Sequence, residues 1–94
     1  MNIKRYKSLV SSLGCIVPGC ESPAVLHHPL FAKRGLSSRA PDWLVIPLCP
    51  GHHNQGTYGQ CIHNGTRAFE ANIDMTEQEM LGAVIKVVVG MTDL

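Results

Sequence analysis

The spacing of apolar positions changes along this chain and predicts helices near both ends. At the start, apolar side chains recur every three or four residues, as they do on one face of a helix. Because Gly14 then terminates the pattern, we predict a helix or a basic arm over residues 1–13. The apolar positions are Tyr6, Leu9, Val10 and Leu13.

Near the C-terminus, Thr76 precedes Glu79 by three residues, which is the capping-box pattern of a helix N-terminus. We predict a helix over residues 76–88 that buries one apolar stripe in the core. A shorter helix is favoured over "TRAFEAN", residues 66–72. The stripe of the longer helix consists of Met80, Ala83, Val84, Val87 and Val88.

Between the helices, two short β-branched and apolar segments are typical of strands. They are "AVLHHPL" (24–30) and "WLVIPL" (43–48), and the loop between them contains Gly, Pro, Ser and three cationic residues. We predict an irregular β-hairpin. Its strands should be short or lie at sheet edges, because Pro29 and Pro47 lack the amide hydrogen that a central strand donates.

Length and composition indicate one α+β domain spanning residues 1–94, with a thin core. A chain of 94 residues buries only about 60–65% of its unfolded surface. With 45% hydrophobic and 16% charged residues, the composition is that of a globular protein. The longest apolar run, "MLGAVIKVVVGM", is interrupted by Lys86 and is shorter than the roughly 20 residues of a membrane span. We expect no membrane segment, and a core that needs additional stabilisation.

Cysteines and histidines are interleaved in the middle of the chain, and this pattern favours metal binding. Four cysteines allow two disulfides, as in a small secreted protein. Disulfide bonds, however, do not involve imidazoles, whereas zinc and catalytic metals are commonly bound by them. We favour metal over disulfide, which implies a reducing, cytosolic setting.

The cysteines predict a structural zinc site. Cys15 and Cys20 flank one Pro-Gly turn, Cys49 and His52 flank another, and two such pairs can close a tetrahedral Zn²⁺ site. Such a site contributes an apparent ~10–16 kcal/mol to folding, comparable with the ~5–15 kcal/mol stability of a whole domain. Cys61 is either a replacement for one of these ligands or, as we favour, a spare buried thiol.

Three further imidazoles, His27, His53 and His63, predict a second and catalytic ion. Three neutral nitrogens can hold a divalent metal and leave coordination positions open for hydrolysis. The glycine-rich stretch before His63 predicts a loop or a single turn, so His63 is a ligand through loop geometry or is not a ligand. His28 remains free to deprotonate a water molecule.

The chain resembles the HNH endonuclease superfamily over roughly residues 15–70. The resemblance is carried by "LHHPL", a basic loop, "PDWLVIPLCPGHHN" and "IHNG". Within this superfamily the likeness is to the phage recombination-enhancement, Ref-type RecA-dependent nucleases. This resemblance implies a ββα-metal fold around one catalytic Mg²⁺, Mn²⁺ or Zn²⁺. By position it implies that His27 is a metal ligand, that His28 is the general base, and that His53 and His63 are later ligands. Asp42 lies near the expected position of the name-giving Asn, where it would brace the loop and orient the base; an ordinary turn aspartate is the alternative.

The resemblance further implies a DNA endonuclease in the cytoplasm of a bacterial host, encoded by a phage or prophage. The net charge is only +1, but the first 39 residues carry six lysines and arginines against one acidic residue. We expect Lys33, Arg34 and Arg39 to contact DNA phosphates. A recombinase filament or a dimer would supply specificity. Trp43 is expected to be a core anchor rather than a base-stacking residue. The alternative function is a non-catalytic zinc-stabilised module that binds nucleic acid or protein.

Overall fold

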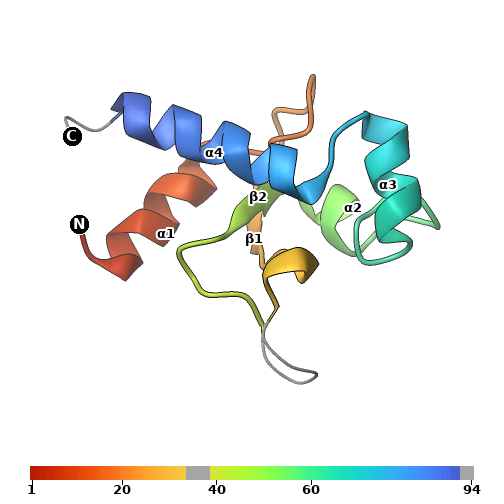
Figure 1. Ribbon diagram of the computed structural model, residues 1–94. Coiled ribbons are helices and arrows are strands. Elements are labelled where there is room, and N and C mark those ends of the chain that lie inside the picture. Colours follow the sequence, from red (N-terminus) through yellow and green to blue (C-terminus); the bar gives the residue numbers. More distant parts are fainter. Residues whose placement is uncertain (34–38, 92–94) are drawn as a thin grey trace.

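The computed structural model describes residues 1–33 and 39–91, and its helices surround a two-stranded antiparallel sheet (Figure 1). The α+β class, the hairpin and the two flanking helices predicted from the sequence are confirmed. In chain order the elements are α1 (Ile3–Ser12), β1 (Val25–His27), the 3-10 helix η1 (Leu30–Ala32), β2 (Ile46–Leu48), α2 (Pro50–His53), α3 (Thr66–Ile73) and α4 (Glu77–Met91).

The hairpin is as short as its prolines predict, with three residues in each strand. Leu26 pairs with Pro47, and His27 pairs with Ile46 at the end of β1. The carbonyl of Pro47 accepts a hydrogen bond from the amide of Ile16 at 2.9 Å, which ties β2 to the segment that follows α1. Every residue of β2 is buried, so the strand forms the centre of the molecule.

Two apolar clusters pack on opposite sides of this central segment. Val45 contacts the cluster between α1 and α4, whereas its neighbour Ile46 contacts the cluster that includes Phe69 of α3. Neighbouring residues diverge in this way because successive side chains of an extended segment point to opposite faces. The segment from Val45 onward therefore joins both halves of the core.

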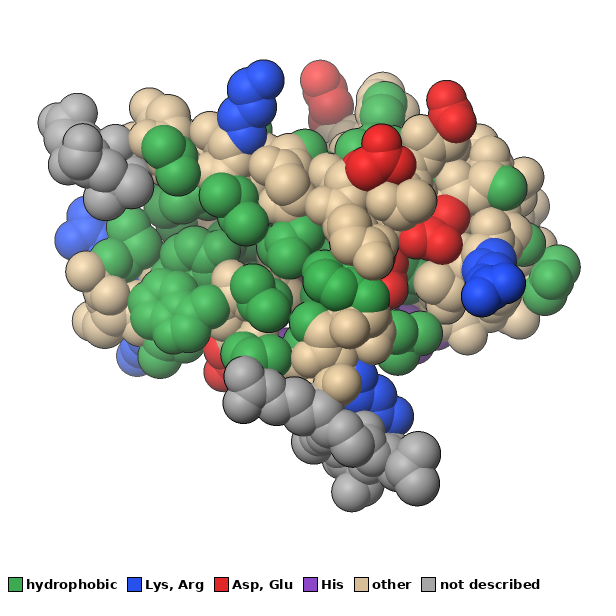
Figure 2. Space-filling view, viewed as in Figure 1, with side chains coloured by type: hydrophobic (Ala, Val, Ile, Leu, Met, Phe, Trp, Pro, Cys, Tyr) green, Lys and Arg blue, Asp and Glu red, His purple; other side chains and the backbone are tan. Residues whose placement is uncertain are grey.

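Apolar side chains also remain on the surface. Figure 2 shows them gathered over α1 and the C-terminal part of α4, where Ile85, Val89 and Met91 are exposed. Few histidine atoms are visible from this side.

The buried stripe of α4 differs from the predicted one. The helix continues to Met91, and its buried residues include Glu77 and Leu81, whereas Val87 is 43% exposed. At about 100° per residue, Val87 lies roughly 80° from the centre of the observed stripe. The predicted burial of Met80, Val84 and Val88 is confirmed, whereas that of Val87 is wrong, because the buried face also includes Glu77 and Leu81 and is therefore turned away from Val87.

The role predicted for Trp43 as a core anchor is also wrong. Its side chain is 46% exposed, and its ring contacts Tyr6 of α1 with a centroid separation of 4.8 Å. Trp43 therefore covers the rim of the core rather than filling it.

The capping box at the start of α4 is present and makes a testable contribution to stability. The amide of Glu79 donates to Thr76 Oγ1 at 3.1 Å, and the amide of Thr76 donates to Glu79 Oε1 at 3.0 Å. We expect Thr76→Ala to lower the free energy of unfolding by about 1 kcal/mol, because a helix amide loses its acceptor. Urea denaturation measures this change. Gln78→Ala, on the same exposed turn, is the control, and an equal effect of both variants would contradict the assignment.

Candidate metal centres

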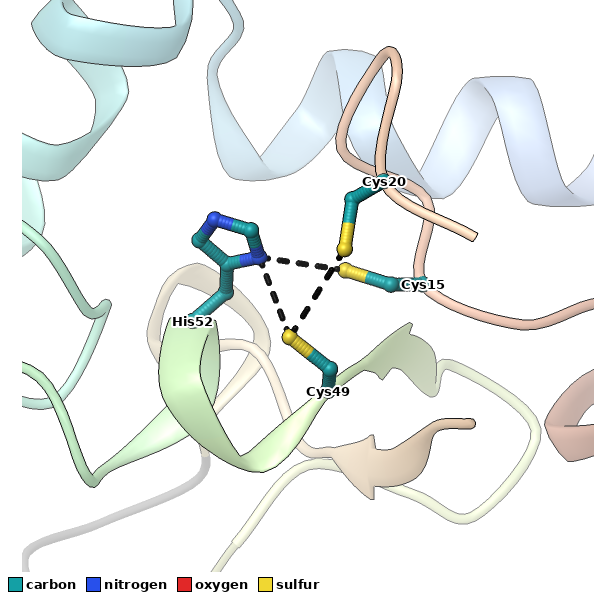
Figure 3. A group of neighbouring side chains, drawn as sticks. All are labelled: Cys15, Cys20, Cys49 and His52. Atoms are coloured by element: carbon teal, nitrogen blue, oxygen red, sulfur yellow. Dashed lines mark hydrogen bonds between the residues drawn. The ribbon is translucent and has the colours of Figure 1, made fainter. Parts of the chain in front are cut away.

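Four side chains from two distant segments converge in one group: Cys15, Cys20, Cys49 and His52 (Figure 3). Their ligand atoms all lie within 4.8 Å of one another. Cys20 Sγ and Cys49 Sγ are 3.8 Å apart, and His52 Nδ1 is 3.1 Å from Cys49 Sγ. In a tetrahedral site with Zn–S bonds of about 2.3 Å, two thiolates stand about 3.8 Å apart. We call these residues the cysteine cluster, and they can hold a metal ion such as zinc.

Local sequence explains how each half of the cysteine cluster forms. Gly19 adopts a φ of +82°, which favours glycine, and this turn reverses the chain before Cys20. Cys49 is the N-cap of α2, and Pro50 occupies the first helical turn, where its missing amide hydrogen costs nothing. The Pro-Gly turn predicted here is one turn of helix, which returns His52 to the side of Cys49.

The pKa shifts of the cysteines indicate how a bound cation would affect the cluster. Burial raises the pKa of the Cys15 thiol to about 11, whereas a backbone hydrogen bond at Ser22 lowers the pKa of Cys20. A bound cation stabilises the thiolate that burial disfavours. The cysteines are free thiols, and the 3.8 Å between Cys20 Sγ and Cys49 Sγ far exceeds the roughly 2.05 Å of a disulfide.

A second group, which we call the histidine cluster, contains His27, His53 and His63, with ligand nitrogens within 4.8 Å of one another. His53 Nε2 and His63 Nε2 are 2.9 Å apart, and the ring of His27 lies 5.3 and 5.2 Å from theirs, centroid to centroid. Desolvation lowers the pKa of His53 to about 4 and also lowers the pKa of His63. Both imidazoles are therefore neutral at pH 7, which is the form that binds metal.

The chain between His53 and His63 folds back on itself, as its glycines predict. The amide of His63 donates to the carbonyl of His53 at 3.0 Å. Gly59 has a φ of +78°, and a Cβ added at Gly56 would lie 2.8 Å from a backbone carbonyl oxygen. These two positions require glycine, and turns rather than a long helix bring His63 next to His53.

His28 forms a pair with Asp42 beside the histidine cluster. Its Nε2 lies 2.8 Å from Asp42 Oδ1, and the charge of His28 contributes to lowering the pKa of His53. The hydrogen bond from His28, and then the charges of Lys7 and Arg39, hold the pKa of Asp42 below its usual value. The pairing of His28 with Asp42 was expected from the resemblance, whereas Lys7, whose Nζ is 3.7 Å from the carboxylate, was not expected here.

Glu77, the first residue of α4, was also not expected at this site. Its side chain is almost fully buried, and its Oε2 lies 2.6 Å from His27 Nε2. The only signal in the sequence is its position three and four residues before Met80 and Leu81, on the face that those residues bury. An acidic residue in the first turn of a helix normally faces solvent, so this position alone does not predict burial.

Lys33 and Arg39, which the sequence predicts to contact DNA, belong to neither cluster. Lys33 is exposed, and Arg39 is exposed with its Nη2 3.5 Å from Asp42 Oδ1. Arg34 lies outside the described residues. Cys61 is fully buried and donates to the carbonyl of Gly56, so it is a buried thiol apart from the cysteine cluster.

Comparison with protein-family models, with curated proteins and with solved structures gives no match for this chain. Across residues 1–33 and 39–91, every helix is too short or too polar to cross a membrane. The fold and the cysteine cluster define the class: a small α+β domain that can hold a metal ion such as zinc.

Proposed function

We propose that this chain is an HNH-like, metal-dependent endonuclease that hydrolyses phosphodiester bonds in DNA. The observation that carries the proposal is the contrast between two neighbouring groups of ligands. The cysteine cluster offers four ligands, enough to close a tetrahedral site, whereas the histidine cluster offers three. Structural zinc sites are closed, and catalytic sites keep an open position. The chain order of β1, β2 and α2, with His53 at the end of α2, also fits a ββα-metal arrangement.

The pair of His28 and Asp42 supports the role of His28 as general base. When the ring proton of His28 is on Nε2, Asp42 Oδ1 accepts a hydrogen bond from it. The lone pair of His28 Nδ1 is then free to take a proton from water. The nearby Lys7 and Arg39 keep Asp42 ionised, which favours that tautomer. A divalent ion at the histidine cluster would polarise a phosphate oxygen and stabilise the departing sugar oxygen. Of the expected ions, Zn²⁺ suits three imidazoles better than Mg²⁺, which prefers oxygen ligands.

Cationic side chains near His28 support DNA as the substrate. Lys7 and Arg39 both lie within 4 Å of Asp42, and Lys33 is exposed at the start of the same loop. Phosphate contacts of this kind position DNA without reading its sequence. Because the net charge is only +1, specificity would come from a recombinase filament or a second copy of the chain.

Cleavage of supercoiled plasmid tests the proposal directly. The purified protein is incubated with plasmid and Mg²⁺, Mn²⁺ or Zn²⁺, with and without EDTA, and its bound metal is counted by elemental analysis. We expect nicking that depends on the ion and stops when EDTA removes it. His63→Ala, which removes a ligand of the histidine cluster alone, should abolish nicking and leave the protein folded. Two tightly bound ions without nicking under any condition would instead favour the non-catalytic binding module.

A further inference from the structure

A buried carboxylate lies behind the histidine cluster and has no part in the chemistry described above. We propose that Glu77 is a positioning residue: it holds His27 in the tautomer that presents Nδ1 to a metal ion, and it anchors the backbone that carries His28. This inference rests on the proposed function in taking the histidine cluster to be a metal site and His28 to be the base.

The hydrogen bond to His27 determines the tautomer. A carboxylate has no proton to donate, so the 2.6 Å contact between Glu77 Oε2 and His27 Nε2 places the ring proton on Nε2. The lone pair of His27 is then on Nδ1. Among the described residues, His27 Nδ1 is the buried side-chain nitrogen or oxygen that lacks a hydrogen-bond partner. Buried polar atoms are normally satisfied, and a metal ion shared with His53 and His63 would satisfy this one.

The charge of Glu77 also favours a cation at this place. Glu77 is only 3% exposed, and within residues 1–33 and 39–91 its carboxylate contacts an imidazole and a backbone amide. A buried charge is unfavourable without a compensating charge. An ion bound on the opposite side of the His27 ring would supply it. A carboxylate that is hydrogen-bonded to a metal-binding histidine orients the imidazole and raises its basicity.

Glu77 anchors the chain on both sides of His28. Its Oε2 contacts His27, and its Oε1 and Oε2 lie 3.1 and 3.2 Å from the amide nitrogen of Leu30. Glu77 is itself held at the junction of α3 and α4, because its amide donates to Glu70 Oε2 at 2.7 Å. One carboxylate therefore restrains the segment that carries both the metal ligand His27 and the base His28.

Three variants separate positioning from a purely structural role. Glu77→Gln keeps the shape and can still accept from His27, but removes the charge. Glu77→Ala also removes the acceptor. Glu79→Ala is the matched control, because it removes a carboxylate from the same turn of α4 without contact to His27. Each protein is first loaded with a single equivalent of Zn²⁺ to fill the cysteine cluster and is then titrated with Co²⁺. Absorption of Co²⁺ without thiolate charge-transfer bands identifies binding by imidazoles.

We expect the affinity for Co²⁺ to fall about 10-fold in Glu77→Gln and about 100-fold in Glu77→Ala, and to stay unchanged in Glu79→Ala. Nitrogen-15 NMR of the metal-free histidine cluster should show the Nε2–H tautomer of His27 in the parent and in Glu77→Gln, and a mixture of tautomers in Glu77→Ala. Parent-like Co²⁺ affinity and an unchanged tautomer in Glu77→Ala would overturn the inference.

The same experiment keeps this inference apart from the proposed function. If the parent binds Co²⁺ with the expected dependence on Glu77 but never nicks plasmid, the positioning role is supported and the nuclease is not. If the parent nicks plasmid and both Glu77 variants bind Co²⁺ as tightly as the parent, the nuclease is supported and the positioning role is overturned. A parent that binds no ion beyond the zinc of the cysteine cluster overturns both.

Discussion

Cys49→Ala is expected to leave the domain largely unfolded at room temperature. Cys49 is the N-cap of α2, and its Sγ lies 3.1 Å from His52 Nδ1 and 3.8 Å from Cys20 Sγ, so it joins both halves of the cysteine cluster. A structural zinc site contributes an apparent ~10–16 kcal/mol, and a typical domain has only about 5–15 kcal/mol of stability in total. Circular dichroism during thermal unfolding, with and without EDTA, measures the loss.

Cys61→Ala is the matched control for this experiment. It removes a thiol that is also buried but lies outside the cysteine cluster, so it should cost about 1–3 kcal/mol and leave zinc bound. Because His53 directly follows His52 in α2, we expect Cys49→Ala to displace the histidine cluster as well. Equal melting temperatures for Cys49→Ala and Cys61→Ala would contradict the structural-zinc assignment. A melting temperature of the parent that is the same with and without EDTA would also contradict it.

The second large effect is expected at His28, where His28→Ala should slow plasmid cleavage by about 10²- to 10⁴-fold. The reason is the loss of the group that takes a proton from water, while the side chains of the histidine cluster stay in place. The rate is measured in a single turnover with excess protein, and the bound metal is counted in the same sample.

The number of bound metal ions distinguishes the loss of the base from the loss of a metal ligand. His28→Ala should fold and retain as many ions as the parent, whereas His63→Ala should lose one ion along with cleavage. If His28→Ala cleaves as fast as the parent at equal metal content, His28 is not the base.

Much of this protein was predictable from residues that are close together in the chain. The capping box of Thr76 and Glu79 and the pair of Cys49 and His52 depend on spacings of three residues, which turn or helix geometry alone converts into contacts. The short strands follow from their prolines. The grouping of three histidines was also anticipated, because the intervening glycines allow the chain to reverse.

The contacts between elements that are distant in the chain were decided by the tertiary structure alone. His27 and Glu77 are 50 positions apart, and no local pattern indicates that a carboxylate at the start of α4 is buried against β1. The same holds for Lys7 of α1 beside Asp42, and for the exposure of Val87 and Trp43. The sequence by itself determined the two long helices, the two strands, the candidate ligands and their pairing within each turn. The packing of α4 and α1 around β1 and β2 decided which charges surround those ligands, because burial depends on the whole fold and not on neighbours in the chain.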